Sequence, residues 1–167
     1  MNIELLKWSD NYLEDIVTVY NNIDRSFLSD RIPDPYTKDD ALHWIAFVNE
    51  HEGIDAMYRM IVVDGRMAGS ISLEYKSDVF KCDAEIGYLL SDEYKGRGIM
   101  TEVVEQLCRD AFRNRELLRV SALVYDANSA SKRVLEKNGF VLEGVMRNAV
   151  VKNDNTFDLC IYGKLRD

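Results

Sequence analysis

The feature that most constrains the fold is a run of three strand-like segments that passes directly into a glycine-containing turn and a long amphipathic helix. The first two segments, 57–63 and 67–75, are separated by a turn that begins Asp64-Gly65, a strong signal for a tight hairpin. A third strand is expected from Phe80 to Leu90. Three consecutive strands predict an antiparallel meander, which excludes a helical bundle and the regular strand–helix alternation of a Rossmann fold.

The rest of the chain adds a first strand, four helices and three later strands to this meander. Apolar periodicity predicts helices over 10–22, 38–50, 99–112 and 128–138, and strands over 3–8, 117–124, 140–151 and 156–165. Thr37 is the expected cap of the second helix, and Gly139 the expected left-handed stop of the fourth. We therefore predict an α+β (mixed α/β) fold, with a mostly antiparallel sheet of about seven strands flanked by about four helices.

Length and composition indicate a single domain over residues 1–167. A chain of 167 residues can bury a sizeable core without disulfides or metal, and no Ser/Gly-rich linker or repeat interrupts it. The three cysteines, Cys82, Cys108 and Cys160, are widely spaced and lack a C-x-x-C pattern. They are interpreted as reduced core thiols, and neither a disulfide framework nor a metal site is expected.

The net charge of the chain limits the kinds of molecule that it is expected to bind. The net charge of −8 and a pI near 4.8 disfavour nonspecific nucleic-acid binding and favour encounter with cationic molecules. The N-terminus lacks the pattern of a signal peptide, and no apolar run approaches the roughly 20 residues of a membrane span. We expect a cytoplasmic protein with no membrane partner.

The turn between the meander and the third helix is a candidate anion site. Gly96 and Gly98 leave backbone N–H groups exposed at a helix N-terminus, where a diphosphate can approach closely and Lys95 and Arg97 add positive charge. The alternative is that the two glycines only shape the turn. The sequence has no Walker A pattern, and Thr101 stands where a dinucleotide fingerprint needs a third glycine, so ATP and NAD are disfavoured.

Two stretches make the chain resemble the GNAT superfamily of acetyl-CoA-dependent N-acetyltransferases. The stretch "KGRGIM", residues 95–100, is similar to the family pattern [QR]-x-x-G-x-[GA] and meets it strictly only at Gly98. The stretch "NSASKRVLEKNGFVLEG", residues 128–144, is similar to N-x-x-S followed by V-L-E-K-x-G-F-x-x-E-G in the branch of ribosomal-protein N-terminal (alanine/serine) acetyltransferases. The resemblance implies the GNAT fold, in which the fourth and fifth strands splay apart.

The resemblance also implies a binding site for acetyl-CoA as acetyl donor, with CoA as product. Pantetheine is expected along the fourth strand and the diphosphate at the glycine turn, while Asn128 either binds the pantetheine arm or diphosphate or simply caps its helix. The implied cofactor-binding residues are Tyr88, Leu89, Leu90, Lys95, Gly96, Arg97, Gly98, Ile99, Met100, Thr101, Asn128 and Ser131.

Acetyl transfer needs a polarised thioester carbonyl, a neutral amine and a proton for the departing thiolate. The resemblance assigns carbonyl polarisation to a backbone N–H at Tyr88 or Leu90. Leu135 occupies the position of the tyrosine acid of many relatives, so Ser131 is the candidate group at the sulfur. Glu85 is the candidate base, with Asp83 on the same side of the strand.

The acceptor is expected to be a primary amine. By counting, Val150 replaces a glutamate of the ribosomal branch, so Glu85 is the one candidate base and an easily deprotonated acceptor is favoured. Because an α-amine has a pKa of about 8 and a lysine amine one of about 10.4, a protein N-terminus is the easier acceptor. A polyamine or other small amine stays open, and so does a non-catalytic acyl-CoA-binding sensor or scaffold. The chain is expected to be a monomer or homodimer.

Overall fold

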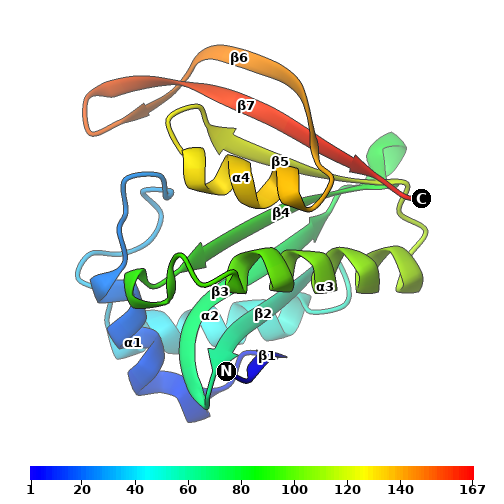
Figure 1. The fold of residues 1–167 in the computed structure, drawn as a ribbon. Helices are drawn as coiled ribbons and strands as arrows, with labels where there is room; N and C mark the ends of the chain where they lie inside the picture. The colour runs from blue at the N-terminus through cyan, green and yellow to red at the C-terminus, as the bar shows by residue number, and fades with distance from the viewer. The chain divides into compact units, whose positions relative to one another are not determined.

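The computed structural model describes all 167 residues, and its elements follow the predicted order (Figure 1). The strands are β1 (Ile3–Leu6), β2 (Ala56–Val63), β3 (Arg66–Tyr75), β4 (Asp83–Leu90), β5 (Arg119–Tyr125), β6 (Val141–Lys152) and β7 (Asn155–Leu165). The helices are α1 (Leu13–Asn22), α2 (Lys38–His51), α3 (Ile99–Asn114) and α4 (Ser129–Lys137). Short 3-10 helices are η1 (Asp10–Tyr12), η2 (Asp78–Phe80) and η3 (Asp92–Tyr94). None of the helices combines the length and apolar character needed to cross a membrane.

The strands form one sheet in the order β1-β2-β3-β4-β5-β7-β6. β1 with β2, β5 with β7 and β6 with β7 are antiparallel, whereas β4 and β5 are parallel, with the register joining Asp83–Glu85 to Arg119–Ser121. The predicted mixed, mostly antiparallel sheet is therefore confirmed. By contacts the chain divides into two compact units, 1–73 with 88–99 and 74–87 with 100–167, so its single-domain organisation stays a prediction.

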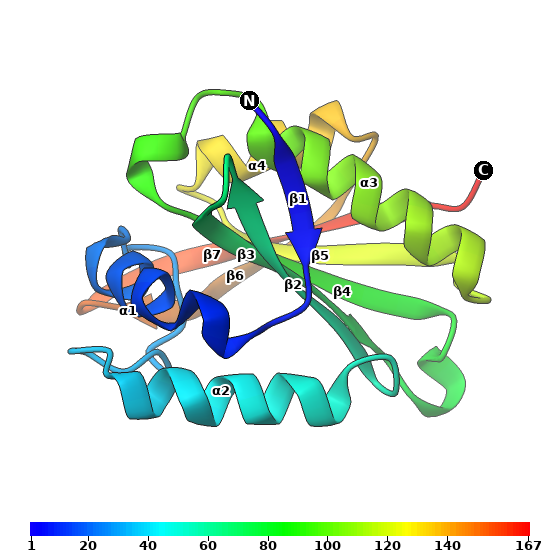
Figure 2. The same cartoon turned by 90° about the horizontal axis from the view of Figure 1, so that it is seen from below.

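The first unit has an aromatic-rich core between its strands and its two helices. Alternate residues of β2 pack with buried residues of α1 and α2, and Figure 2 shows these helices beside β1 and β2. The rings of Tyr20 and Tyr36 stack with centroids 4.7 Å apart. Other buried members of this core are Trp8, Ile16, Val19, Ala41, Ile45, Val48, Ala56, Tyr58, Met60 and Val62.

Local signals in the first unit are confirmed. Asp64 and Gly65 both have positive φ, 49° and 82°, as in the type I′ turns that match the twist of a hairpin. Thr37 caps α2: its side chain accepts from the Asp40 N–H, and the Asp40 carboxylate accepts from the Thr37 N–H at 2.8 Å. These contacts satisfy two of the free donors at the start of the helix.

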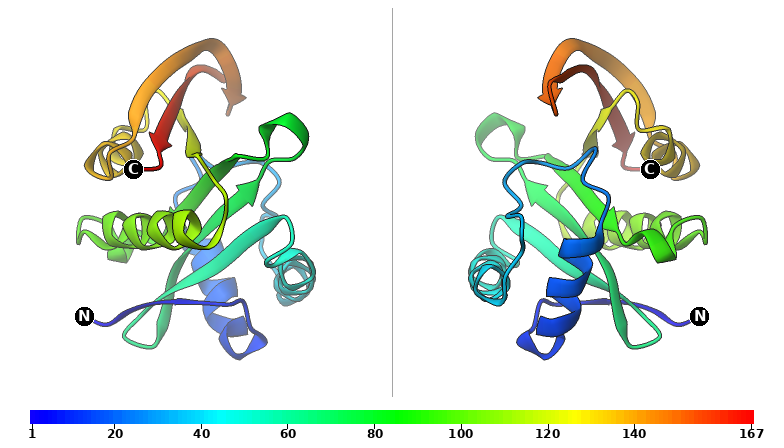
Figure 3. Two further views of the ribbon diagram at one scale, coloured as in Figure 1. Left: turned by 90° about the vertical axis from the view of Figure 1, so that its right-hand side faces the viewer. Right: turned by 90° about the vertical axis from the view of Figure 1, so that its left-hand side faces the viewer.

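The second unit is built around a long β6–β7 hairpin beside β5 and α4 (Figures 1 and 3). β5 pairs with β7 along its whole length, from Arg119 opposite Leu165 to Tyr125 opposite Leu159. β6 bulges between Met146 and Val150. The predicted end of α4 is confirmed, because Gly139 has a φ of 78° that favours glycine.

Three expectations about element ends and cysteines are wrong. β4 begins at Asp83 instead of near Phe80, because Phe80 is the last residue of η2 and residues 81–82 form the turn that follows it. β1 ends at Leu6, because Ser9 already caps η1 by accepting from the Asn11 N–H at 3.2 Å. Cys108 and Cys160 are buried free thiols as predicted, but Cys82 is only half-buried, beside the turn that precedes β4.

Candidate active site

The glycine turn before α3 has a backbone that requires glycine. Gly96 and Gly98 have φ values of 75° and 80°, a region that other residues enter only with strain. A Cβ built on either residue would meet nothing within 4 Å. The glycines therefore shape the turn, as the alternative interpretation of the sequence expected. They also leave the space beside the turn open to a ligand.

The two cationic side chains of this turn have partners from η3. Lys95 forms an ion pair of 2.5 Å with Asp92, and both side chains are about half exposed. The Arg97 guanidinium carbon lies 5.6 Å from the centre of the Tyr94 ring, within the range of a cation–π contact. A diphosphate at this turn would compete with Asp92 for Lys95, whereas Arg97 can keep its ring contact and still donate to an anion.

The side chains of the first two residues of α3 are buried, so only their backbone groups are available to an anion at the turn. Ile99 and Met100 are 1% and 7% exposed, so both are core residues. The carbonyl of Thr101 accepts from the Asn138 amide at 3.1 Å, which joins the start of α3 to the end of α4 within the second unit. Any contact of Ile99 or Met100 with an anion would therefore run through a helix N-terminal N–H group.

The end of β4 is held firmly in the first unit. Tyr88, Leu89 and Leu90 are half-buried, and the Leu89 side chain packs against the aromatic core. Directly after them, the Ser91 N–H donates to the Ala68 carbonyl of β3 at 2.8 Å. The backbone expected to bind pantetheine is thus anchored by a side chain and by a hydrogen bond.

Two structural features of the first unit were not predicted from the sequence. The Arg25 guanidinium donates to the carbonyls of Tyr20, Ile32 and Pro33 at 2.8–2.9 Å, and so closes the loop between α1 and α2. Gly69 of β3 lies against the backbone of Leu89 and Leu90. The signal for Gly69 was available, since a glycine inside a strand pattern indicates close backbone approach.

In the second unit the two carboxylates of β4 have different environments. Asp83 is 7% exposed and accepts from Lys76 at 2.6 Å and from the Ser121 hydroxyl at 3.2 Å. Arg119 lies 3.4 Å from the same Asp83 oxygen and also donates to Glu143 at 2.7 Å. All three contacts are to Oδ2, whereas Oδ1 is buried without a hydrogen-bond partner, so Asp83 belongs to a structural ion-pair network.

Glu85, the candidate base predicted from the sequence, lies in a different environment from Asp83. Its side chain is half-buried, and burial raises the pKa of the carboxyl above its ordinary value. Lys76 lowers the pKa, while Glu74 and Asp83 raise it further. A carboxylate with a raised pKa binds a proton more tightly, which suits a group that takes a proton from an ammonium.

Asn128 and Ser131 are adjacent partners at the start of α4. The Asn128 side-chain oxygen accepts from the Ser131 N–H at 3.1 Å, so the capping role of Asn128 is confirmed. The Ser131 side chain is half-buried. Leu135 is fully buried, which suits its apolar side chain, and Val150 pairs with Phe157 just after the bulge of β6.

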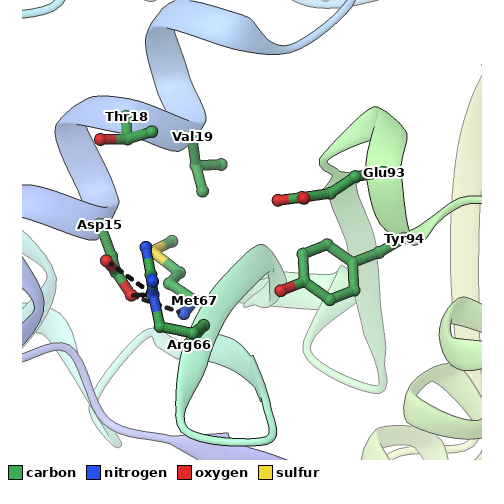
Figure 4. A pocket seen from close by; sticks show the side chains of 7 residues that line it. All are labelled: Asp15, Thr18, Val19, Arg66, Met67, Glu93 and Tyr94. Atoms are coloured by element: carbon green, nitrogen blue, oxygen red, sulfur yellow. Dashed lines mark hydrogen bonds and ion pairs between the residues drawn. The ribbon is translucent and has the colours of Figure 1, made fainter.

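A small polar pocket in the first unit is lined in part by Glu93 and Tyr94 of η3. Its volume is about 130 Å³, and Figure 4 shows Glu93 and Tyr94 pointing toward it from one side, opposite Asp15 and Arg66. Asp15 accepts from Arg66 at 3.1 Å and from the Met67 N–H at 3.0 Å. The pocket is smaller than the roughly 300–1,000 Å³ of small-molecule sites, and none of its lining residues was a predicted site residue.

Comparison with known proteins identifies the family. The model of the acetyltransferase (GNAT) domain matches residues 2–141. The chain belongs to the GNAT acetyltransferase family. It is 36% identical over 106 residues, 64% of the chain, to the putative ribosomal N-acetyltransferase YdaF of Bacillus subtilis. It is 32% identical over 108 residues, 65% of the chain, to the ribosomal-protein-serine acetyltransferase of Escherichia coli.

These alignments span 57% and 60% of the two relatives' own lengths. The fold of this GNAT domain is shared with RimL, a ribosomal α-N-protein acetyltransferase solved in complex with coenzyme A. The TM-score is 0.87 at 21% identity, covering 99% of this chain and 94% of that one. The GNAT fold predicted from the sequence is confirmed, while the splay of β4 and β5 and the role of each site residue stay predictions.

Proposed function

We propose that this GNAT domain is an acetyl-CoA-dependent N-acetyltransferase that acts on a primary amine, with a protein N-terminal α-amine as the favoured acceptor. The observation that carries the proposal is the open Gly96–Gly98 turn directly before the first residue of α3. Bare N–H groups and the helix dipole favour a diphosphate there. The names of the two relatives support a ribosomal-protein acceptor.

In this proposal the reaction is a direct transfer. The neutral amine nitrogen attacks the thioester carbonyl carbon, a C–N bond forms and the C–S bond breaks. Before the attack Glu85 takes a proton from the acceptor ammonium, directly or through water. The proton that the nitrogen loses after the attack passes through water to the departing thiolate, and the Ser131 hydroxyl donates a hydrogen bond to that sulfur. The backbone N–H of Leu90 or Tyr88 stabilises the developing oxyanion. Acetyl-CoA supplies the acetyl group, and CoA is the second product.

The acceptor preference follows from the cost of deprotonation. Making a lysine-like amine neutral at pH 7 costs about 4.6 kcal/mol, and an α-amine of pKa about 8 costs about 1.4 kcal/mol. Asp83 is held by Lys76 and Arg119, so Glu85 is the remaining β4 carboxylate that can act as a base. With a single base, the acceptor that is easier to deprotonate, the α-amine, is favoured.

The test is release of CoA from acetyl-CoA with three matched acceptors. These are a peptide with a free N-terminal alanine or serine, the same peptide with a blocked N-terminus and an internal lysine, and spermidine. The proposal expects turnover with the free N-terminus and one added acetyl group on that residue by mass spectrometry. Turnover with spermidine alone would make a small amine the acceptor. Tight CoA binding with no turnover on any amine would favour the acyl-CoA-binding module instead.

A further inference from the structure

Gly69 of β3 is in unusually close contact with the backbone of β4. A Cβ built on Gly69 would lie 2.2 Å from the Leu89 carbonyl oxygen and 2.9 Å from the Leu90 Cα. Both are backbone atoms, so a rotamer change cannot relieve the overlap. The Ser91 N–H donates to the Ala68 carbonyl at 2.8 Å, which holds the two strands together at this point.

This contact fixes the direction of the peptide that joins Leu89 to Leu90. Its carbonyl oxygen occupies the place of a side chain at position 69, so the oxygen is directed onto β3. The peptide is trans, because the cis bond of the chain is Asp34-Pro35. A trans peptide directs its C=O and N–H to opposite sides, and the Leu90 N–H therefore points away from β3.

We infer that Gly69 is a positioning residue for the donor end of the reaction: it lets the Leu89–Leu90 peptide lie close to β3 and so aims the Leu90 N–H at the pantetheine or thioester of acetyl-CoA. The inference rests on the proposed function. Gly69 touches neither cofactor nor acceptor and acts through the β4 backbone. The Leu89 side chain packs on the aromatic core and so anchors the residue whose carbonyl lies against Gly69.

A second strand glycine provides a control for the general effect of replacing glycine by alanine. A Cβ on Gly144 of β6 would meet its nearest neighbour, the Ile161 side chain, at 3.9 Å, an ordinary contact. Neither Gly69 nor Gly144 has a positive φ. Gly144→Ala is therefore a matched control, since it adds the same methyl group to a strand glycine without overlap.

The experiment compares wild type, Gly69→Ala and Gly144→Ala in binding to two ligands by calorimetry. CoA carries pantetheine, whereas 3′-phosphoadenosine 5′-diphosphate carries only the nucleotide and diphosphate. Gly69→Ala should weaken CoA binding at least about tenfold, the loss expected for one or two backbone hydrogen bonds. It should leave the Kd for the pantetheine-free ligand within about twofold of wild type, and Gly144→Ala should leave both values unchanged.

Equal weakening of both ligands by Gly69→Ala, or unchanged CoA affinity in a folded variant, would overturn the inference. Wild-type protein that binds neither ligand would overturn the proposed function, which is a separate and recognisable result. If Gly69→Ala does not fold, the Leu90 amide of the wild type provides the test by NMR. Its resonance should shift and its hydrogen exchange should slow on addition of CoA but not of the pantetheine-free ligand. An unchanged Leu90 amide would overturn the inference.

Discussion

The Lys76 ammonium donates to the buried Asp83 carboxylate across 2.6 Å and belongs to the set of charges that act on the pKa of Glu85. The same lysine therefore acts on two carboxylates of β4: it pairs with Asp83 and lowers the pKa of Glu85. Asp83 has its Oδ2 occupied by Lys76, Ser121 and Arg119, whereas Glu85 forms no ion pair. This division leads to opposite expectations for the two amide variants.

Asp83→Asn should lower stability and leave the chemistry to Glu85. Removing the charge leaves Lys76 and Arg119 without their buried partner, which should cost about 2 kcal/mol or more of unfolding free energy. Urea unfolding measures the loss. The control is Glu105→Gln in the exposed pair with Arg109, expected to change stability by about 0.5 kcal/mol or less. An equal loss of unfolding free energy in the two variants would contradict the structural role of Asp83.

Glu85→Gln should lower the rate about 10²–10⁴-fold at neutral pH, the usual range for a positioned acid–base group. The loss should shrink as pH rises, because the amine then loses its proton to solvent without help. The measurement is kcat/KM for both proteins across pH 6 to 10 with the same acceptor. A parallel offset over this range would exclude Glu85 from proton transfer.

The same substitution has an expected sign for stability. Burial raises the pKa of Glu85 in the folded state, so the folded protein binds that proton more tightly than the unfolded chain. The stabilisation is complete below the ordinary Glu pKa of 4.5 and is lost as pH rises through the raised folded value. At neutral pH the Glu85 charge therefore costs stability. Glu85→Gln should melt at the same temperature as wild type or higher at pH 7, and a clearly lower Tm would contradict this sign.

Gly98→Glu should abolish binding of CoA while the protein stays folded. The carboxylate places negative charge beside the expected diphosphate, and the added side chain fills the open space of the turn. Gly53→Glu is the matched control, because Gly53 has the same φ of 80° and the same absence of atoms within 4 Å of its Cβ. Both variants carry the backbone strain of roughly 1–2 kcal/mol, and only Gly98→Glu should lose CoA in calorimetry. Unchanged CoA affinity in Gly98→Glu would contradict the diphosphate assignment.

Ser131→Ala should lower kcat at least about tenfold and change the KM for acetyl-CoA much less, if the hydroxyl serves the departing sulfur mainly in the transition state. The helix cap survives the change, because Asn128 accepts from the Ser131 backbone N–H. Ser129→Ala, at an exposed position two residues earlier in α4, is the control and should leave kcat unchanged. Steady-state kinetics of the two variants decide between a role at the sulfur and a purely helical one.

The sequence alone determined the features that depend on local conformational preference. Asp64-Gly65 specified its hairpin because both residues tolerate positive φ, and Thr37 specified the start of α2 because its side chain satisfies a free helix N–H. Gly139 specified the end of α4 in the same way. The glycine turn at 96–98 was also predictable, because glycine is the residue that adopts positive φ without strain.

Tertiary structure decided the features that depend on which groups meet across the chain. The alternation of side chains along β4 predicted that Asp83 and Glu85 lie on the same face. Only the structure shows that Lys76, Ser121 and Arg119 contact Asp83, which leaves Glu85 as the candidate base. A glycine inside the β3 pattern signalled a close backbone approach, but only the structure shows that its partner is the Leu89 carbonyl, because Gly69 has no left-handed φ and its requirement comes from a neighbouring strand. Backbone propensity acts over a few residues, whereas charge partners and close approach are set by packing between segments distant in sequence.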